Sequence, residues 1–193
     1  MKRFFSYPGA VGESLLTTVF EEIFCGSQLF REMYKREPAF FRGKGAIENE
    51  RVILLPESLD QLASVLGSAN FGVSSGRPFN LALYTLNGLL ERFNPEALFF
   101  LDRIEAAERE NAGRKGSCVR LKKPNPFSLL ESSRAFEPFR FALYVGDSVE
   151  DVIMVKEANG VDSRFLFAGV HGHSDCQRDL LRSFLEMGSD IVL

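Results

Sequence analysis

The sequence predicts an α/β fold in which a Rossmann-like parallel sheet carries helices on both faces, preceded by a small helical segment. Two observations lead to this prediction. From about residue 50 onward, short apolar runs alternate with segments of helical periodicity, which is the pattern of repeated strand-helix-strand units. Residues 14–37 show apolar side chains at helical spacing alone. We therefore expect a helical segment over residues 1–49 and an α/β core over residues 50–193.

Two short helices are expected within residues 14–37. Apolar residues recur there at intervals of three and four, and Cys25-Gly26 interrupts the series. The stretch 42–45 contains two glycines and is predicted to be the loop that separates these helices from the core.

The first half of the core is predicted to contain two strands. A helix over residues 59–66 leads into the strand 71–74. The next helix begins at Pro78, because proline suits the first turn of a helix. Residues 97–101 then form a second buried strand that ends at Asp102.

The second half is expected to begin with an irregular segment. Residues 105–122 are mostly Glu, Arg, Lys, Gly and Asn with almost no apolar period, so they are predicted to be a loop or a frayed helix end. The expected order after it is a helix through Leu129 and Phe136, strand 141–145, a helix through Val152 and Ala158, strand 164–168, helix 180–185 and strand 191–193.

Composition restricts the function without naming it. Hydrophobic residues make up 45%, charged residues 25% and the net charge is -3, as in ordinary globular proteins. Lys and Arg number 23 against 26 Asp and Glu, which disfavours general nucleic-acid binding. Pro8 and Gly9 interrupt the N-terminus before a signal-peptide core could form, and no stretch suits a membrane span, so a cytoplasmic protein is expected. Cys25, Cys118 and Cys176 are too widely spaced to suggest a zinc site or a disulfide framework.

Polar side chains gather in three segments next to predicted strands and helices. They are Ser75-Gly76-Arg77-Pro78 after strand 71–74, Lys123-Pro124 before a helix, and residues 146–151, Gly-Asp-Ser-Val-Glu-Asp, after strand 141–145. Ligands of open parallel sheets bind beyond the carboxyl ends of the strands, so these segments are the first candidates for a site. Singly, each is also an ordinary turn or helix N-cap. Together they supply a hydroxyl and N–H groups for phosphate, a lysine to neutralise it and carboxylates for Mg²⁺.

The order of these three segments resembles the second, third and fourth signature motifs of haloacid dehalogenase superfamily phosphatases, over residues 50–193. The resemblance implies that Ser75 hydrogen-bonds the transferring phosphoryl group, together with the backbone at Gly76 and Arg77. Lys123 would offset the charge of both the nucleophile and the phosphate.

The fourth motif would supply the metal site of this family. The resemblance implies that Asp147 ligates Mg²⁺, and that Asp151, one helical turn further on, supports the metal directly or through a second group. The implied activity is magnesium-dependent hydrolysis of a small phosphorylated metabolite through an aspartyl-phosphate.

Residues 1–49 would then resemble the small helical cap that many of these enzymes place over the active site, and caps select substrates. Basic residues of this segment could meet an anionic substrate or simply form a solvated face. They are Arg31, Lys35, Arg36, Arg42 and Lys44.

The first motif of the family is missing. Its reaction uses an aspartate as nucleophile, usually with a second aspartate two positions later as general acid and base. No Asp-x-Asp precedes Ser75, and the first aspartate is Asp60, inside a predicted helix. Asp102 also ends a strand, but its place in the order matches an ordinary strand end. The chain alone is therefore expected to be inactive.

The missing motif implies a missing central strand between the strands that end at Ser75 and Gly146. Each unpaired buried backbone group costs about 1 to 3 kcal/mol, so something is expected to fill the gap. The candidates are a separate N-terminal fragment, a second chain that supplies the strand and its Asp-x-Asp, and the apolar run 52–55.

Two other interpretations follow from the same residues. The chain could be a non-catalytic α/β module that retains a phosphate or metal site for binding or regulation. His171-Gly172-His173, with Asp175 and Cys176 nearby, could form a transition-metal site, although the same residues fit a solvated loop.

Overall fold

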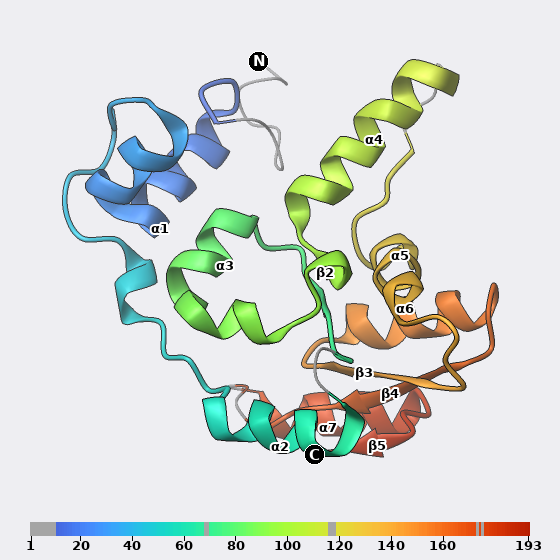
Figure 1. Cartoon of the computed structure of the whole chain (residues 1–193). Helices are drawn as coiled ribbons and strands as arrows, with labels where there is room; N and C mark the ends of the chain where they lie inside the picture. Colours follow the sequence, from blue (N-terminus) through green and yellow to red (C-terminus); the bar gives the residue numbers. More distant parts are fainter. Residues whose placement is uncertain (1–10, 68–69, 116–118, 173, 175) are drawn as a thin grey trace. The chain divides into compact units, whose positions relative to one another are not determined.

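The computed structural model describes residues 11–67, 70–115, 119–172, 174 and 176–193. The chain divides into two compact units, whose course along the chain can be followed in Figure 1. The first comprises Met1–Leu55 and Leu83–Asn87, and the second comprises Pro56–Ala82 and Gly88–Leu193. Among the described residues, every strand longer than an isolated bridge belongs to the second unit.

The first unit is built on helix α1, Leu15–Tyr34, which a glycine interrupts. Gly26 has φ 72° and ψ 170°, outside the helical range, so the expected pair of short helices with a break at Cys25-Gly26 is confirmed. At the break, Gly26 pairs with Lys44 in an antiparallel bridge. An added Cβ at Gly26 would lie 2.3 Å from the backbone nitrogen of Gly45, so this crossing of two chain segments needs glycine.

A buried carboxylate on α1 binds the backbone of residues 39–41, which follow the helix. Glu22 is buried, and its two oxygens accept hydrogen bonds from the backbone N–H groups of Ala39, Phe40 and Phe41 at 2.9, 2.6 and 2.9 Å. A buried charge is stable only where donors satisfy it, and hydrogen bonds to a carboxylate are stronger than neutral ones. Glu22 thereby fixes the loop that precedes the 3₁₀ helix η1, Ala46–Asn49.

From residue 56 onward, helices alternate with short strands. The helices are α2 (Pro56–Leu66), α3 (Phe79–Leu86), η2 (Asn87–Arg92), η3 (Pro95–Ala97), α4 (Leu101–Lys115), α5 (Phe127–Ser133), η4 (Arg134–Phe136), α6 (Val149–Asn159) and α7 (Gln177–Glu186). The strands are β1 (Val73–Ser74), β2 (Leu98–Phe99), β3 (Ala142–Gly146), β4 (Phe165–Gly169) and β5 (Ile191–Val192).

The strands form two small parallel sheets. One contains β1 and β2, and the other has the order β3-β4-β5. The predicted class, α/β with parallel strands, is therefore confirmed. The strands predicted at 71–74, 141–145, 164–168 and 191–193 are all present within one or two residues of the expected positions, except that β1 is shorter.

Among the described residues, the outer strands β1, β2, β3 and β5 each have one edge without a neighbouring strand. Within the described residues, β1 pairs with β2 alone and β3 pairs with β4 alone. The run 52–55 forms no strand, and Val52, Ile53 and Leu55 are exposed, so it does not fill the expected gap. Pro56 directly follows the run and begins α2, so the chain turns into a helix where the run ends.

The core of the three-stranded sheet is formed with α5, α6 and α7. Its buried members are Leu129, Val152, Met154, Val155, Ala158, Phe165, Phe167 and Phe184. The apolar residues of α6 and β4 provide most of it, so the helix that follows β3 is held firmly against the sheet.

The other strand predicted in the first half of the core, β2, is present but shorter than expected. The strand expected over 97–101 comprises only Leu98–Phe99, because α4 begins at Leu101. The N–H of Leu101 donates to the carbonyl of Arg77 at 3.0 Å, which turns the chain out of the ladder.

The prediction of a loop or a frayed helix end over residues 105–122 is wrong for residues 105–115, which are helical, whereas residues 119–122 are not in a helix. Residues 105–115 belong to α4, and of its described side chains only Ile104 is buried. A helix with one buried residue has no apolar period to detect. The segment nevertheless forms a helix because its Glu, Ala and Arg residues have high helix propensity, which a search for apolar periodicity does not detect.

Candidate functional site

The loop after β1 carries the first candidate residues. Ser75 is half-buried, and its N–H donates to the carbonyl of Phe99 at 2.9 Å, so it continues the pairing of β1 with β2. The hydroxyl oxygen of Ser75 accepts a hydrogen bond from the N–H of Arg77 at 3.2 Å. An added Cβ at Gly76 would meet no atom within 4 Å, so the backbone there is open to a ligand. The loop thus offers a hydroxyl and accessible backbone at the carboxyl end of β1.

Asp102, in the first turn of α4, contacts the end of this loop. Its carboxylate accepts the N–H of Phe79 at 2.6 Å, at the start of α3. Arg77 reaches forward to the same helix, where its Nη2 lies 3.4 Å from the carbonyl of Leu81. Asp102 therefore caps a helix, a structural role in keeping with the expectation that it is not a nucleophile.

Lys123 and Asp151 form a close ion pair. Nζ of Lys123 lies 2.6 Å from Oδ1 of Asp151, and the two side chains are only 17% and 4% exposed. The fold thus joins the predicted cation before α5 to a predicted carboxylate in the first turn of α6. Because both groups are largely removed from water, salt screens their attraction little.

The second oxygen of Asp151 is engaged as well. Oδ2 accepts hydrogen bonds from the N–H of Ser148 at 3.1 Å and from its hydroxyl at 2.7 Å, which forms a capping box at the start of α6. An added Cβ at Gly146 would lie 2.7 Å from the Asp151 carboxylate, so glycine at the end of β3 makes room for it. The resemblance implies that Asp151 supports the metal either directly or through a second group. Since both of its oxygens already accept hydrogen bonds, Asp151 fits the second of these roles.

Asp147 is the carboxylate that remains for a cation. It is exposed in the turn between β3 and the N-cap Ser148. Mg²⁺ takes oxygen ligands and is commonly held by one or two carboxylates, with waters and substrate phosphate completing the shell. An exposed carboxylate in the turn before the hydrogen-bonded Asp151 fits such a site. In the part of the chain that the structure describes, no three His, Cys, Asp or Glu residues gather as metal ligands.

Tyr144 on β3 is the site residue that the sequence analysis missed. Its hydroxyl oxygen lies 2.6 Å from Nζ of Lys123 and 3.2 Å from Oδ1 of Asp151, and it donates to the carbonyl of Ser74 at 3.0 Å. Burial raises the pKa of Tyr144, and the negative charge of Asp151 raises it further, so the hydroxyl keeps its proton at neutral pH. Strand alternation was the available signal, because it places Tyr144 with Ala142 on the inner face of β3, where a hydroxyl needs a partner.

The predicted segments are therefore joined to different degrees. Lys123 contacts Asp151 directly, while Ser75 is joined to them through its neighbour Ser74 and Tyr144. Asp147 lies in the adjoining turn with its side chain exposed.

The chain matches no family model, no curated protein and no solved structure. No helix in the described residues is long and apolar enough to cross a membrane.

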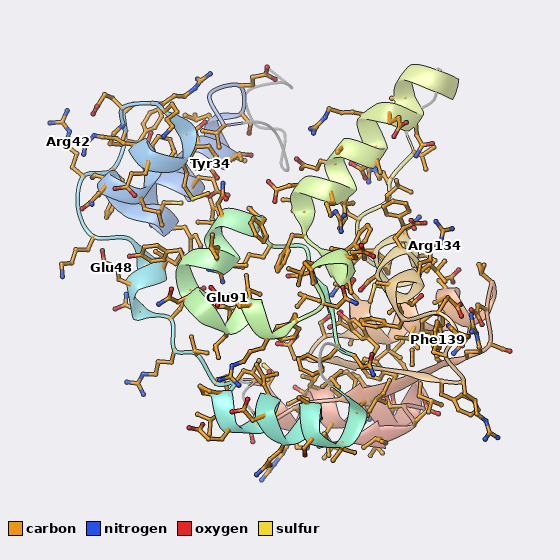
Figure 2. All side chains as sticks on the ribbon, viewed as in Figure 1. Tyr34, Arg42, Glu48, Glu91, Arg134 and Phe139 are labelled. Carbon is orange, nitrogen blue, oxygen red and sulfur yellow. The ribbon has the colours of Figure 1, made fainter. Side chains whose placement is uncertain are left out.

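The basic residues of the first unit are partly neutralised. Arg31 pairs with Glu37 at 2.8 Å, and Lys44 pairs with Glu48 at 3.6 Å. Figure 2 shows Arg42 pointing away from its own segment. These arrangements favour the solvated basic face over a preformed anion site.

A cavity of about 370 Å³ in the same unit supports this interpretation. Its charged lining residues have both signs, with Arg31 and Lys44 opposed by Glu32 and Glu48. An anionic substrate would gain little from such a balanced lining.

The predicted transition-metal residues are only partly described. The N–H of His171 donates to the carbonyl of Leu193 at 3.0 Å. His173 and Asp175 lie outside the described residues, so this site stays a prediction. Cys25 is buried and Cys176 exposed, neither of them in a disulfide, and Cys118 also lies outside the described residues.

Proposed function

We propose that this chain is a magnesium-dependent phosphatase module of the haloacid dehalogenase type, which binds the phosphate of a small phosphorylated metabolite and lacks its own nucleophile. The observation that carries the proposal is the contact of Lys123 with Asp151 at 2.6 Å, beside the end of β1. A partly buried ammonium held between two strand ends is suited to a phosphate dianion.

Each residue of the site has a role in this proposal. The hydroxyl of Ser75 and the backbone at Gly76 and Arg77 would hydrogen-bond phosphate oxygens. Nζ of Lys123 has two hydrogen-bond partners among the described residues, which leaves one of its three N–H groups for a phosphate oxygen. Asp151 orients the ammonium.

Asp147 would hold Mg²⁺. The cation would supply positive charge against the phosphate oxygens and the leaving group. The exposed carboxylate of Asp147 and its position next to the capped start of α6 keep this ligand within reach of a phosphate bound at Lys123.

The missing nucleophile would come from a strand that this chain does not supply. One edge of β1 and one edge of β3 have no partner strand in the described residues, so each could accept a further strand. Phe141, which precedes β3, and Leu143 and Val145 on β3 are 59%, 51% and 55% exposed. Parallel sheets are normally covered on both faces, so this exposed face suits the connection that such a strand would bring. The proposed partner is a second chain or an N-terminal fragment with an Asp-x-Asp at the end of that strand.

The first test is phosphate release from p-nitrophenyl phosphate, together with calorimetric binding of inorganic phosphate, each with Mg²⁺ and with EDTA. We expect no turnover and magnesium-dependent phosphate binding. Asp147→Asn should weaken that binding by about tenfold, the equivalent of one charge-assisted contact. Asp179→Asn, an exposed change on α7, should leave it unchanged. Absence of magnesium-dependent binding would refute the proposal, and magnesium-dependent turnover would refute the missing nucleophile.

The second candidate is a non-catalytic module that binds phosphate or a metal for regulation. The observation that favours it is the absence of Asp-x-Asp from the whole printed sequence. The DNA upstream of the first codon separates the two candidates. An in-frame strand followed by Asp-x-Asp favours the enzyme, and its absence favours the binding module.

A further inference from the structure

We infer that Tyr144 is a positioning residue of the proposed phosphate site, because its hydroxyl fixes the ammonium of Lys123 relative to the end of β1. This inference rests on the proposed function for its consequence, namely phosphate affinity. Its geometric part, the placement of Lys123 by the hydroxyl, stands on the contacts alone.

The hydroxyl of Tyr144 is a junction of three groups. It accepts a hydrogen bond from Nζ of Lys123 at 2.6 Å, and its own proton has two acceptors nearby. The carbonyl of Ser74 lies at 3.0 Å and Oδ1 of Asp151 at 3.2 Å. Because Asp151 already accepts from Lys123, the shorter bond to Ser74 uses the proton best.

This bond joins two parts of the site that no strand pairing joins. Ser75 lies at the end of β1, whereas Lys123 and Asp151 are held beside β3, and β1 and β3 are not paired in the described residues. The Ser74 side chain is tied separately to α5 through the hydroxyl of Ser128 at 2.7 Å. The Tyr144 hydroxyl therefore adds a direct link between the β1 backbone and the ammonium.

The link also sets the direction of the ammonium. Two of its N–H groups are directed to Tyr144 and Asp151, so the direction of the third is determined. With Asp151 as its only anchor, the ammonium would rotate freely about that single bond. Affinity for phosphate should then fall, whereas the exposed carboxylate of Asp147 is untouched.

Replacement by phenylalanine removes the hydroxyl and keeps the ring. The Tyr144 ring stacks on Phe167 with centroids 6.4 Å apart, and Nζ of Lys123 lies 5.2 Å from the Tyr144 ring centroid. Both contacts are available to phenylalanine. The matched control is Tyr84→Phe, because Tyr84 is exposed in the first unit.

The experiment is NMR of the lysine NH₃⁺ groups and backbone amides of the full chain, followed by phosphate titration with Mg²⁺ present. In Tyr144→Phe, the Lys123 NH₃⁺ signal and the Ser75 amide signal should move. The signal of Lys122, whose ammonium pairs with Glu105 at 2.7 Å, should stay in place. Phosphate affinity should fall by about tenfold with unchanged Mg²⁺ affinity, and Tyr84→Phe should match the wild type in all readings.

Two results would overturn the inference. One is a Tyr144→Phe chain that loses thermal stability but keeps the Lys123 and Ser75 signals, which describes a merely structural hydroxyl. The other is a wild-type chain that binds phosphate, together with a Tyr144→Phe chain that binds it with the same affinity. If the two signals move but the wild type binds no phosphate, the placement of Lys123 by Tyr144 is supported and the proposed function fails.

Discussion

Replacing Asp151 by asparagine should destabilise the second unit strongly, because one carboxylate serves two purposes there. Oδ1 holds the ammonium of Lys123 at 2.6 Å, and Oδ2 accepts both donors of Ser148 at the start of α6. An asparagine side chain has one acceptor oxygen, so its amide group must face either the ammonium or the Ser148 donors.

The magnitude follows from the exposure of the partners. Removing one member of a buried ion pair costs about 3 to 5 kcal/mol. Because Lys123 is 17% exposed, water reaches the ammonium, and we expect roughly half of that cost, about 2 kcal/mol. Weakening the capping box adds about 0.5 to 1 kcal/mol. The free energy of unfolding should therefore fall by about 2 to 3 kcal/mol.

Urea unfolding followed by circular dichroism measures this loss, and a double-mutant cycle assigns it. Lys123→Met combined with Asp151→Asn leaves no unpaired ammonium, so the double variant should be more stable than the sum of the single losses by about 1 to 2 kcal/mol. Asp179→Asn, at an exposed position, should cost less than about 0.5 kcal/mol. Additive single losses would show that the pair does not couple the two segments.

Two further predictions concern other parts of the chain. Glu22→Gln should destabilise the first unit by about 1 to 3 kcal/mol in urea unfolding, because one amide oxygen cannot serve the three N–H donors of the following loop. Hydrogen bonds from Arg164 lower the pKa of Glu137 and of Asp162 below their ordinary values of 4.5 and 3.8. Their contribution to stability is therefore complete above those values and is lost as pH falls through the lowered pKa values, so Arg164→Met should flatten the fall in urea midpoint below about pH 4.5.

Each of these two predictions has a control and a result that would contradict it. Glu157→Gln is an exposed change on α6, and a cost equal to that of Glu22→Gln would mean that burial of the carboxylate is not the cause. Arg178→Met is an exposed change on α7 and should keep the wild-type acid profile. An unchanged profile in Arg164→Met would remove these two carboxyl groups as the source of acid sensitivity.

Most elements were predictable from the sequence because their signals are local. β3 and β4 are short apolar runs, and apolar residues recur along α6, so these elements could be placed from the sequence. The break at Gly26 was visible for the same reason. α4 was not, because among its described side chains only Ile104 is buried and the rest of the helix is polar. A helix that forms through the propensity of its residues, without an apolar face, shows no periodic spacing of apolar residues in the sequence.

The site was predictable where its residues carry charge, and not where its contacts depend on the tertiary fold. Lys123 and Asp151 were chosen from their positions near strand and helix ends, and the structure joins them although they are 28 residues apart. The bond from Tyr144 to Ser74 spans 70 residues and uses a backbone carbonyl. Every residue has such a carbonyl, so the sequence does not show which one accepts the bond. The shared use of both Asp151 oxygens was likewise hidden, because it depends on the turn geometry at Gly146.

The charge balance of the site makes a cation necessary for the proposed phosphate binding. Lys123 is already neutralised by Asp151 at 2.6 Å, so the exposed carboxylate of Asp147 leaves these three groups with a net negative charge. A phosphate dianion, and a nucleophilic carboxylate from a further strand, would add more negative charge to a partly desolvated region. Mg²⁺ at Asp147 would offset it. Asp147→Asn should therefore have opposite effects in two titrations: weaker phosphate binding than the wild type with Mg²⁺, and slightly tighter binding in EDTA, where the carboxylate only repels the anion. A variant that weakens binding equally in both titrations would show that Asp147 acts through the structure of the turn and not through a metal.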